Sequence, residues 1–110
     1  MTLYSAPKNF NAEIIGSVDT AGVYEYRILL VMKDKTTGKL YYEVEFGCSC
    51  PSPFELYNSV TELREIVSAD EFAVAARNYI KTSEYATLSD REYVERLISS
   101  VQSRMRKRAA

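Results

Sequence analysis

The sequence contains no histidine, no tryptophan and only two cysteines among its 110 residues. Without histidine, the chain lacks the commonest general base at neutral pH and the commonest metal ligand in proteins. The two cysteines, Cys48 and Cys50, are separated by one serine, so they cannot link distant elements as the disulfides of a secreted scaffold do. We therefore expect no enzyme active site, no cofactor and a reducing cytoplasm as the compartment.

The sequence also has no long hydrophobic run. The longest uninterrupted apolar stretch, residues 28–32, is far shorter than the roughly 20 residues of a membrane-spanning helix, and residues 1–11 lack the basic-then-apolar order of a secretory signal. Apolar residues make up 46% of the chain and charged residues 26%, which is typical of a globular protein. The sequence therefore predicts one folded domain, residues 1–110, that stays in the cytoplasm.

The charge is unevenly distributed along the chain. The formal net charge is −1, but residues 1–103 contain 10 basic and 15 acidic side chains, a balance of −5. The remaining four basic residues, Arg104, Arg106, Lys107 and Arg108, give the C-terminal segment 104–110 a charge of +4. This basic segment is expected to be the frayed end of the last helix.

Three strands are predicted in the first half of the chain, after an irregular lead-in over residues 1–11. Apolar residues favour a first strand over 13–18. Over 23–32, alternate residues from Tyr24 to Met32 form one apolar face and the other face changes from polar to apolar along its length, which is typical of a strand in the centre of a sheet. Residues 34–39 have the composition of a hairpin loop, so the strand that follows runs back antiparallel. On that strand we expect Leu40, Tyr42, Val44 and Phe46 to face the core and Tyr41, Glu43 and Glu45 to face solvent.

Helices are predicted in the second half. Ser52 to Glu55 matches a capping box and predicts a short helical turn, whereas residues 61–67 fit either a helical turn or an extended stretch. Capping boxes at 68–71 and 89–92 open helices over 70–80 and 90–105. The two apolar stripes comprise Phe72, Ala75, Ala76, Tyr79 and Ile80, and Tyr93, Val94, Leu97, Ile98, Val101 and Met105. The predicted fold is α+β: a three-stranded antiparallel meander, then a short helical turn and two helices on one sheet face.

Three groups of residues suggest chemistry. Cys48 and Cys50 form a possible soft-metal or redox pair, although structural zinc takes four ligands and the chain offers two thiolates and no imidazole. Glu43 and Glu45 share one strand face, which favours a solvated surface over cation binding. The basic side chains of Arg104, Arg106, Lys107 and Arg108 are suited to phosphate contacts, but they also interact favourably with a helix C-terminus, and the acidic body opposes nucleic-acid binding.

Residues 47–55, Gly-Cys-Ser-Cys-Pro-Ser-Pro-Phe-Glu, resemble a segment found in a family of small uncharacterised proteins of phages that infect actinobacteria. The similar span covers about residues 10–80, with the same order of strand, hairpin and strand before the segment and a helix after it. The resemblance implies a phage gene product in the bacterial cytoplasm and assigns no activity and no functional residue.

These observations favour an interaction protein that binds a host or phage protein through a tyrosine-rich sheet face or a helix. The first alternative is a nucleic-acid-binding module that uses the basic C-terminal residues. The second alternative is a cysteine-dependent metal or redox protein.

Overall fold

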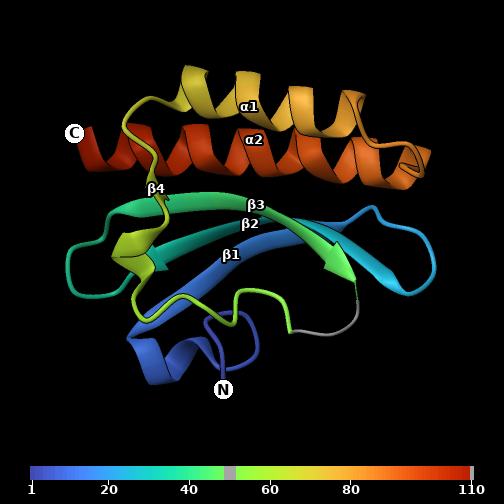
Figure 1. Ribbon diagram of the computed structural model, residues 1–110. Coiled ribbons are helices and arrows are strands. Elements are labelled where there is room, and N and C mark those ends of the chain that lie inside the picture. Colours follow the sequence, from blue (N-terminus) through green and yellow to red (C-terminus); the bar gives the residue numbers. More distant parts are fainter. Residues whose placement is uncertain (49–51, 110) are drawn as a thin grey trace.

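Three long strands and two helices form most of the computed structural model, which describes residues 1–48 and 52–109. The sheet is antiparallel in the order β1-β2-β3-β4, and both helices lie against one of its faces (Figure 1). The strands are β1 (Ala12–Asp19), β2 (Glu25–Asp34), β3 (Leu40–Cys48) and β4 (Arg64–Glu65), and the α-helices are α1 (Ala69–Lys81) and α2 (Leu88–Ala109). Two 3-10 turns, η1 (Pro7–Phe10) and η2 (Val60–Glu62), complete the elements. The predicted α+β fold is confirmed, and β4 adds a short fourth strand within the stretch that the sequence left ambiguous.

The strand β2 is the central strand of the meander, as its alternation predicts. Met32, near the end of β2, illustrates the register: it lies opposite Ile14 of β1 and Tyr41 of β3. The β1–β2 ladder shifts at a bulge between Ile14 and Gly16. A Cβ atom on Gly16 would lie 2.6 Å from the Tyr93 hydroxyl, so glycine at the bulge lets α2 approach the strand closely.

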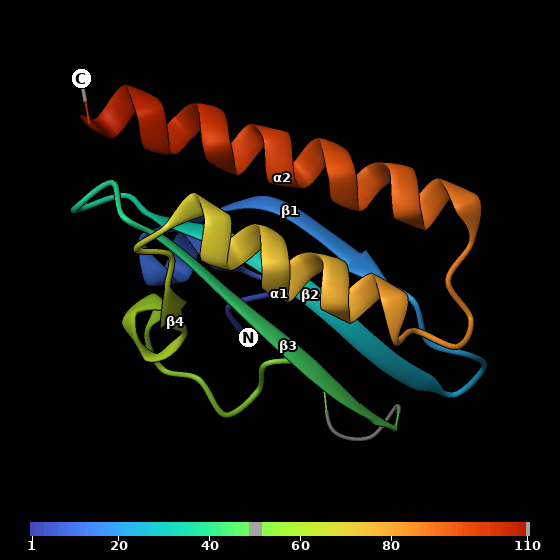
Figure 2. The same cartoon turned by 90° about the horizontal axis from the view of Figure 1, so that it is seen from above.

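The first core lies between the sheet and the helices. Seen from above, α1 crosses over β2 and β3, and α2 lies on the β1 side (Figure 2). The two predicted apolar stripes face this core except for Ala75, and Ala73 is buried there although the predicted stripe did not include it. Strand residues of the facing sheet surface complete the core. Its buried members are Val18, Leu29, Val31, Leu40, Ile66, Phe72, Ala73, Ala76, Tyr79, Ile80, Val94, Leu97, Ile98 and Val101.

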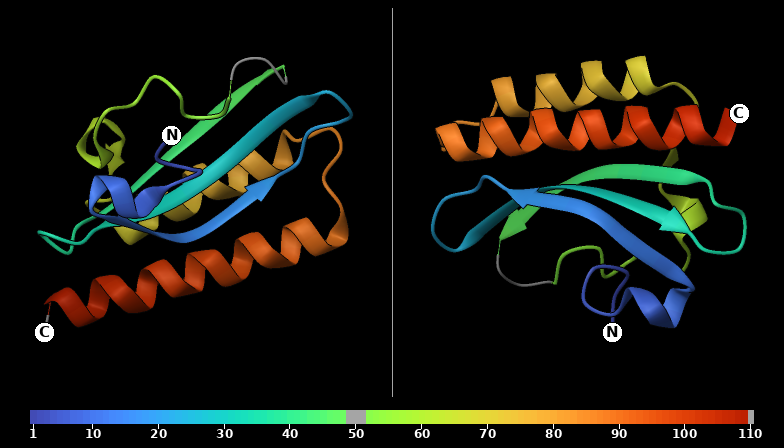
Figure 3. Two further views of the ribbon diagram at one scale, coloured as in Figure 1. Left: turned by 90° about the horizontal axis from the view of Figure 1, so that it is seen from below. Right: turned by 180° about the vertical axis from the view of Figure 1, so that it is seen from behind.

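A second core covers the opposite sheet face. The N-terminal segment and residues 52–63 lie across that face (Figure 3). The buried side chains there are Leu3, Ala12, Tyr26, Ile28, Leu30, Met32, Tyr41, Phe54, Val60 and Leu63. The prediction that Tyr41 faces solvent is wrong, because this cover leaves it only 6% exposed. Phe46 was expected in the core and is 75% exposed, because it lies at the end of β3 where neither layer covers its ring.

The helix starts follow capping chemistry, with one difference from the predicted position. The Ser68 hydroxyl accepts a hydrogen bond from the Glu71 N–H at 3.3 Å, as predicted for α1. At α2 the box is formed two residues earlier than predicted, by Thr87 and Asp90. The Thr87 hydroxyl accepts from the Asp90 N–H at 3.1 Å, and the Asp90 carboxylate accepts from the Thr87 N–H at 3.0 Å.

The helical turn predicted after Ser52 is a sequence of hydrogen-bonded turns and not a helix. Phe54 has a φ of 61°, which is incompatible with a right-handed helix, and its N–H donates to the Glu45 carboxylate at 2.8 Å. This conformation places the Phe54 ring in the second core. Among the described helices, none is long and apolar enough to cross a bilayer.

Candidate functional site

The two edges of the sheet, on β1 and on β3, differ in how far their main-chain groups are covered. The outer edge of β1 has a bulge, and the Ser17 N–H on that edge donates to the Tyr93 hydroxyl of α2 at 3.0 Å. Bulges and covering side chains are the usual means of protecting an edge strand from pairing with another chain. The bulge and this hydrogen bond disfavour regular pairing of a partner strand with the middle of β1.

The opposite edge, on β3, is covered over only part of its length. β4 pairs with Tyr41 and Tyr42 alone, and the Ile66 N–H donates to the Leu40 carbonyl at 2.8 Å. Because main-chain groups alternate in direction along an antiparallel strand, the N–H and carbonyl groups of Val44 and Phe46 also point to this edge. No β4 residue lies opposite Val44 or Phe46.

A single side chain occupies part of the uncovered edge. The Val44 N–H donates to the Glu43 carboxylate at 3.2 Å, and Arg64 Nε lies 3.5 Å from the same carboxylate oxygen. The Val44 carbonyl and the Phe46 N–H and carbonyl have no hydrogen-bond partner in the part of the chain that the structure describes. These three groups form an open segment of ladder on β3.

A groove of about 270 Å³ runs beside the open segment, between β3 and α1. Its wall on the sheet side includes Val44 and the exposed Phe46, and its wall on the helix side includes Ala75, Asn78 and Tyr79. Its full lining comprises Arg27, Tyr42, Glu43, Val44, Phe46, Arg64, Ala75, Asn78 and Tyr79. The groove thus combines free main-chain groups with an apolar surface.

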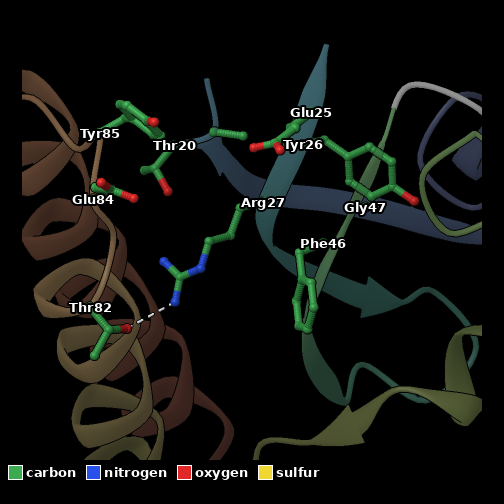
Figure 4. Close-up of a pocket in the computed structure, with 10 residues that line it drawn as sticks. Thr20, Glu25, Tyr26, Arg27, Phe46, Gly47, Thr82, Glu84 and Tyr85 are labelled. Carbon is green, nitrogen blue, oxygen red and sulfur yellow. Dashed lines mark hydrogen bonds between the residues drawn. The ribbon is translucent and has the colours of Figure 1, made fainter. Parts of the chain in front are cut away.

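A second pocket, of about 380 Å³, adjoins the groove at the end of the sheet. It lies where the β1–β2 turn, the end of β3 and the α1–α2 loop meet, and Figure 4 shows Phe46 on one side of Arg27 and Tyr85 on the other. Arg27 and Phe46 line both the groove and this pocket. Together the two cavities form a continuous concave surface, which we call the edge groove.

Arg27 lies in the edge groove without a carboxylate partner among the described residues. Its guanidinium donates to the Tyr79 carbonyl at 2.8 Å, to the Ser83 hydroxyl and to the Thr82 hydroxyl at 2.9 Å. It also lies 4.5 Å from the centre of the Tyr79 ring. Two of the five guanidinium N–H groups therefore have no acceptor within the described protein.

Tyr79 fixes the position of the surrounding elements. Its buried hydroxyl lies 2.6 Å from the Arg27 carbonyl, 3.1 Å from the Val18 carbonyl and 3.0 Å from the Thr20 hydroxyl. Burial is the main reason that the pKa of this hydroxyl is raised, while its hydrogen bond with Thr20 acts in the opposite direction. The hydroxyl remains neutral at physiological pH and links α1 to β1 and β2.

Glu43 and Glu45, expected on a solvated face, are both partly buried beneath residues 52–63. Desolvation raises the pKa of the Glu45 carboxyl above its ordinary value of 4.5, the hydrogen bond from the Phe54 N–H lowers it, and the nearby Glu43 raises it. The net direction is upward, so folding favours the protonated form of Glu45.

We expect Glu45→Gln to increase stability at pH 7 relative to the wild type, with little difference near pH 4. When folding raises the pKa of a group, that group stabilises the folded state fully at pH values below its pKa in the unfolded chain. This contribution is lost as the pH rises through its pKa in the folded protein. The glutamine keeps an acceptor for the Phe54 N–H and has no such loss. Urea unfolding at about pH 4 and about pH 7 measures the difference. Glu92→Gln, on the exposed face of α2, is the control, and an equal pH effect in both variants would contradict the assignment.

A comparison with protein families provides one match. The family model for a domain of unknown function, DUF7574, matches residues 1–108. The chain belongs to this family. The DUF7574 match covers nearly the whole chain and includes the edge groove, and it shows no phage or actinobacterial origin. No curated protein and no solved structure matches the chain.

The cysteine pair of this DUF7574 domain is only partly described by the structure. Cys48 is the last residue of β3 and is exposed, and Cys50 lies outside the described residues. Within residues 1–48 and 52–109, no three His, Cys, Asp or Glu side chains gather closely enough to hold a metal ion. The metal and redox alternatives for Cys48 and Cys50 therefore stay predictions.

The four basic C-terminal residues belong to α2 and separate into two groups. Arg104, Lys107 and Arg108 line a pocket of about 180 Å³ together with Lys33 of β2. Arg106 lies on another side of the helix, beside Met105 and Asp70. The DUF7574 fold thus brings three of the four predicted residues together and adds a fourth cation that the linear sequence did not indicate.

Proposed function

We propose that this DUF7574 domain is a non-enzymatic interaction protein that binds an extended segment of a partner protein as an additional strand on β3. The supporting observation is the open ladder segment at Val44 and Phe46 beside the edge groove. In such strand addition, main-chain hydrogen bonds supply affinity and neighbouring pockets select alternate side chains. Both components are present on the same edge.

The chemistry of the edge groove limits the partner segment. An apolar side chain of the added strand would lie against the Phe46 ring and the helix side of the groove. The two unused N–H groups of Arg27 favour a carboxylate in the same segment, because a charge-assisted hydrogen bond to guanidinium is stronger than a neutral one. The proposed ligand is therefore an extended peptide with one apolar and one acidic side chain.

The proposal replaces the tyrosine-rich sheet face as the binding surface. Tyr26 and Tyr41 are buried in the second core, so the sheet faces are covered and an edge is the more accessible part of the sheet. The resemblance of residues 47–55 to a phage family supports a role as a phage-type accessory protein in the bacterial cytoplasm, with a host or phage protein as the partner.

The test is a selection of random peptides displayed on phage against the wild-type domain, followed by main-chain N-methylation of a selected peptide. Strand addition predicts that methylation at every second residue abolishes binding and that methylation of the residues between them has little effect, because only alternate N–H groups face β3. An amide-exchange measurement should show new protection of the Phe46 N–H when the peptide is bound.

Two variants at one position separate the main chain from the ring. Phe46→Pro removes both the ring and the outward N–H without removing a β2–β3 hydrogen bond, and we expect about a tenfold loss of affinity relative to Phe46→Ala, or about 1.4 kcal/mol. Phe46→Ala keeps the N–H and tests the ring alone. Val23→Ala, an exposed apolar residue outside the groove, is the matched control. Peptides that bind Phe46→Pro as tightly as the wild type would refute the proposed function.

A further inference from the structure

A corner of the molecule, beside the β2–β3 hairpin and the last turns of α2, concentrates positive charge. Lys33, Arg104, Lys107 and Arg108 line one pocket of about 180 Å³, together with Gly38 and Leu40. We call this pocket the basic corner. No carboxylate lines it, and none of its four cations forms an ion pair with a described carboxylate.

Elsewhere on the same domain, basic side chains do pair. Arg77 lies 3.0 Å from Glu95, and Lys39, next to the basic corner in sequence, lies 3.9 Å from Glu65. Glu13 is opposite Lys33 in the β1–β2 register and still forms no ion pair with it. Asp34 accepts a hydrogen bond from the Thr36 N–H at 2.9 Å and is buried. The surrounding carboxylates therefore leave the four cations without direct partners.

The helix dipole accounts for only part of this arrangement. The C-terminus of a helix carries roughly half a negative charge, which favours basic residues in its last turn. That effect applies to Lys107 and Arg108 of α2 but not to Lys33, which is on a strand. Four formal positive charges also greatly exceed the partial charge of the helix end, so the basic corner has a positive potential that attracts an anion.

The size and lining of the basic corner indicate the kind of anion. A pocket of about 180 Å³ is small for a nucleoside, and no aromatic side chain lines it for stacking on a base. The four basic residues line one pocket, and Arg106 lies on another side of α2, so they do not form the extended basic stripe that follows a nucleic-acid backbone. Guanidinium and ammonium groups that converge from two elements suit the several oxygens of one phosphate group.

We propose that the basic corner binds a small phosphate-bearing anion, with Lys33, Lys107 and Arg108 donating to its oxygens from two sides. Arg104 supplies further positive charge from the helix, where its Nε lies 3.5 Å from the Ser100 hydroxyl. This site is independent of the edge groove, so a failure of either proposal leaves the other intact.

Titration of the full chain with inorganic triphosphate tests the basic corner. We expect saturable binding by calorimetry, a rise in the unfolding temperature and amide chemical-shift changes centred on Gly38 and the last turns of α2. Binding should weaken markedly between about 0.1 M and about 1 M ionic strength, where the Debye length falls from about 10 Å to about 3 Å. The absence of saturable binding at the lower ionic strength would overturn the proposal.

Charge-neutral variants test the geometry. Lys33→Gln and Arg108→Gln should each weaken triphosphate binding about tenfold, or about 1.4 kcal/mol. The unfolding temperature of the free protein should change little, because relief of like-charge repulsion offsets the lost interaction of Arg108 with the helix C-terminus. Arg106→Gln is the matched control, with the same loss of net charge from the same helix turn, and should leave the affinity within about twofold, or about 0.4 kcal/mol. Equal losses in Arg106→Gln and Arg108→Gln would show that only net charge matters and would refute a defined site.

Titration with a short DNA duplex distinguishes a phosphate site from a nucleic-acid-binding surface. We expect a short duplex to bind more weakly than triphosphate, because the negative balance of residues 1–103 repels an extended polyanion. Duplex binding that is tighter than triphosphate binding and equally sensitive to Arg106→Gln and Arg108→Gln would overturn the proposal in favour of an extended nucleic-acid surface.

Discussion

Phe54→Ala is expected to destabilise the domain by about 3–5 kcal/mol, the usual cost of removing a buried aromatic ring. Phe54 is fully buried, and its ring centre lies 5.8 Å from that of Tyr4 and 5.9 Å from that of Tyr57. The ring therefore joins the N-terminal segment and residues 52–63 to the sheet. Since small domains have only about 5–15 kcal/mol of net stability, the variant should unfold at a much lower urea concentration.

The controls for Phe54→Ala separate the second core from the first. Phe72→Ala removes a ring of the same size from the helix side and should have a similar effect. Leu56→Ala lies in the same covering segment but is exposed, so its effect should stay within about 0.5 kcal/mol. A cost for Phe54→Ala as small as that of Leu56→Ala would mean that the second core contributes little to stability.

The sequence predicts the periodic part of this fold and not the part that depends on irregular segments. Alternation over residues 23–32 and helical spacing over 70–80 identify their elements, because β2 contributes alternate residues to the two cores and α1 buries one face. Leu3 and Phe54 belong to segments without periodicity, so only tertiary contacts reveal their burial. The same cover explains why Tyr41, predicted to face solvent, is buried.

The two candidate sites also depend on distances that the linear sequence does not contain. The edge groove exists because β4 is only two residues long, and the stretch 61–67 gave no clear indication of a strand. Phe46 alternates correctly with Leu40, Tyr42 and Val44, but the alternation does not show where the cover ends. Lys33 joins the basic corner only through the register of β2 and the length of α2. The basic segment itself was visible in the charge distribution.

Tyr79→Ala is expected to cost about 3–5 kcal/mol, because it removes a buried ring and also the hydroxyl that connects three elements. Tyr79→Phe separates these contributions. It keeps the ring and the contact with the Arg27 guanidinium but leaves the Val18 carbonyl and the Thr20 hydroxyl without the Tyr79 partner. We expect Tyr79→Phe to cost about 1–3 kcal/mol, the range for unsatisfied buried polar groups. Equilibrium urea unfolding of the two variants gives both values.

A double-mutant cycle with Thr20→Val tests whether the hydroxyls act as one network. Thr20 is buried and bonds both Tyr79 and the Ser83 hydroxyl, so the combined variant should differ from the sum of the single changes by about 0.5 kcal/mol or more. Additive effects would contradict a shared network.

The Tyr79 variants also test the edge groove, because Tyr79→Phe leaves the helix wall of the groove intact. A peptide selected on the wild type should therefore bind Tyr79→Phe normally, and lose affinity for Tyr79→Ala, whose missing ring frees Arg27 from the position that the groove requires.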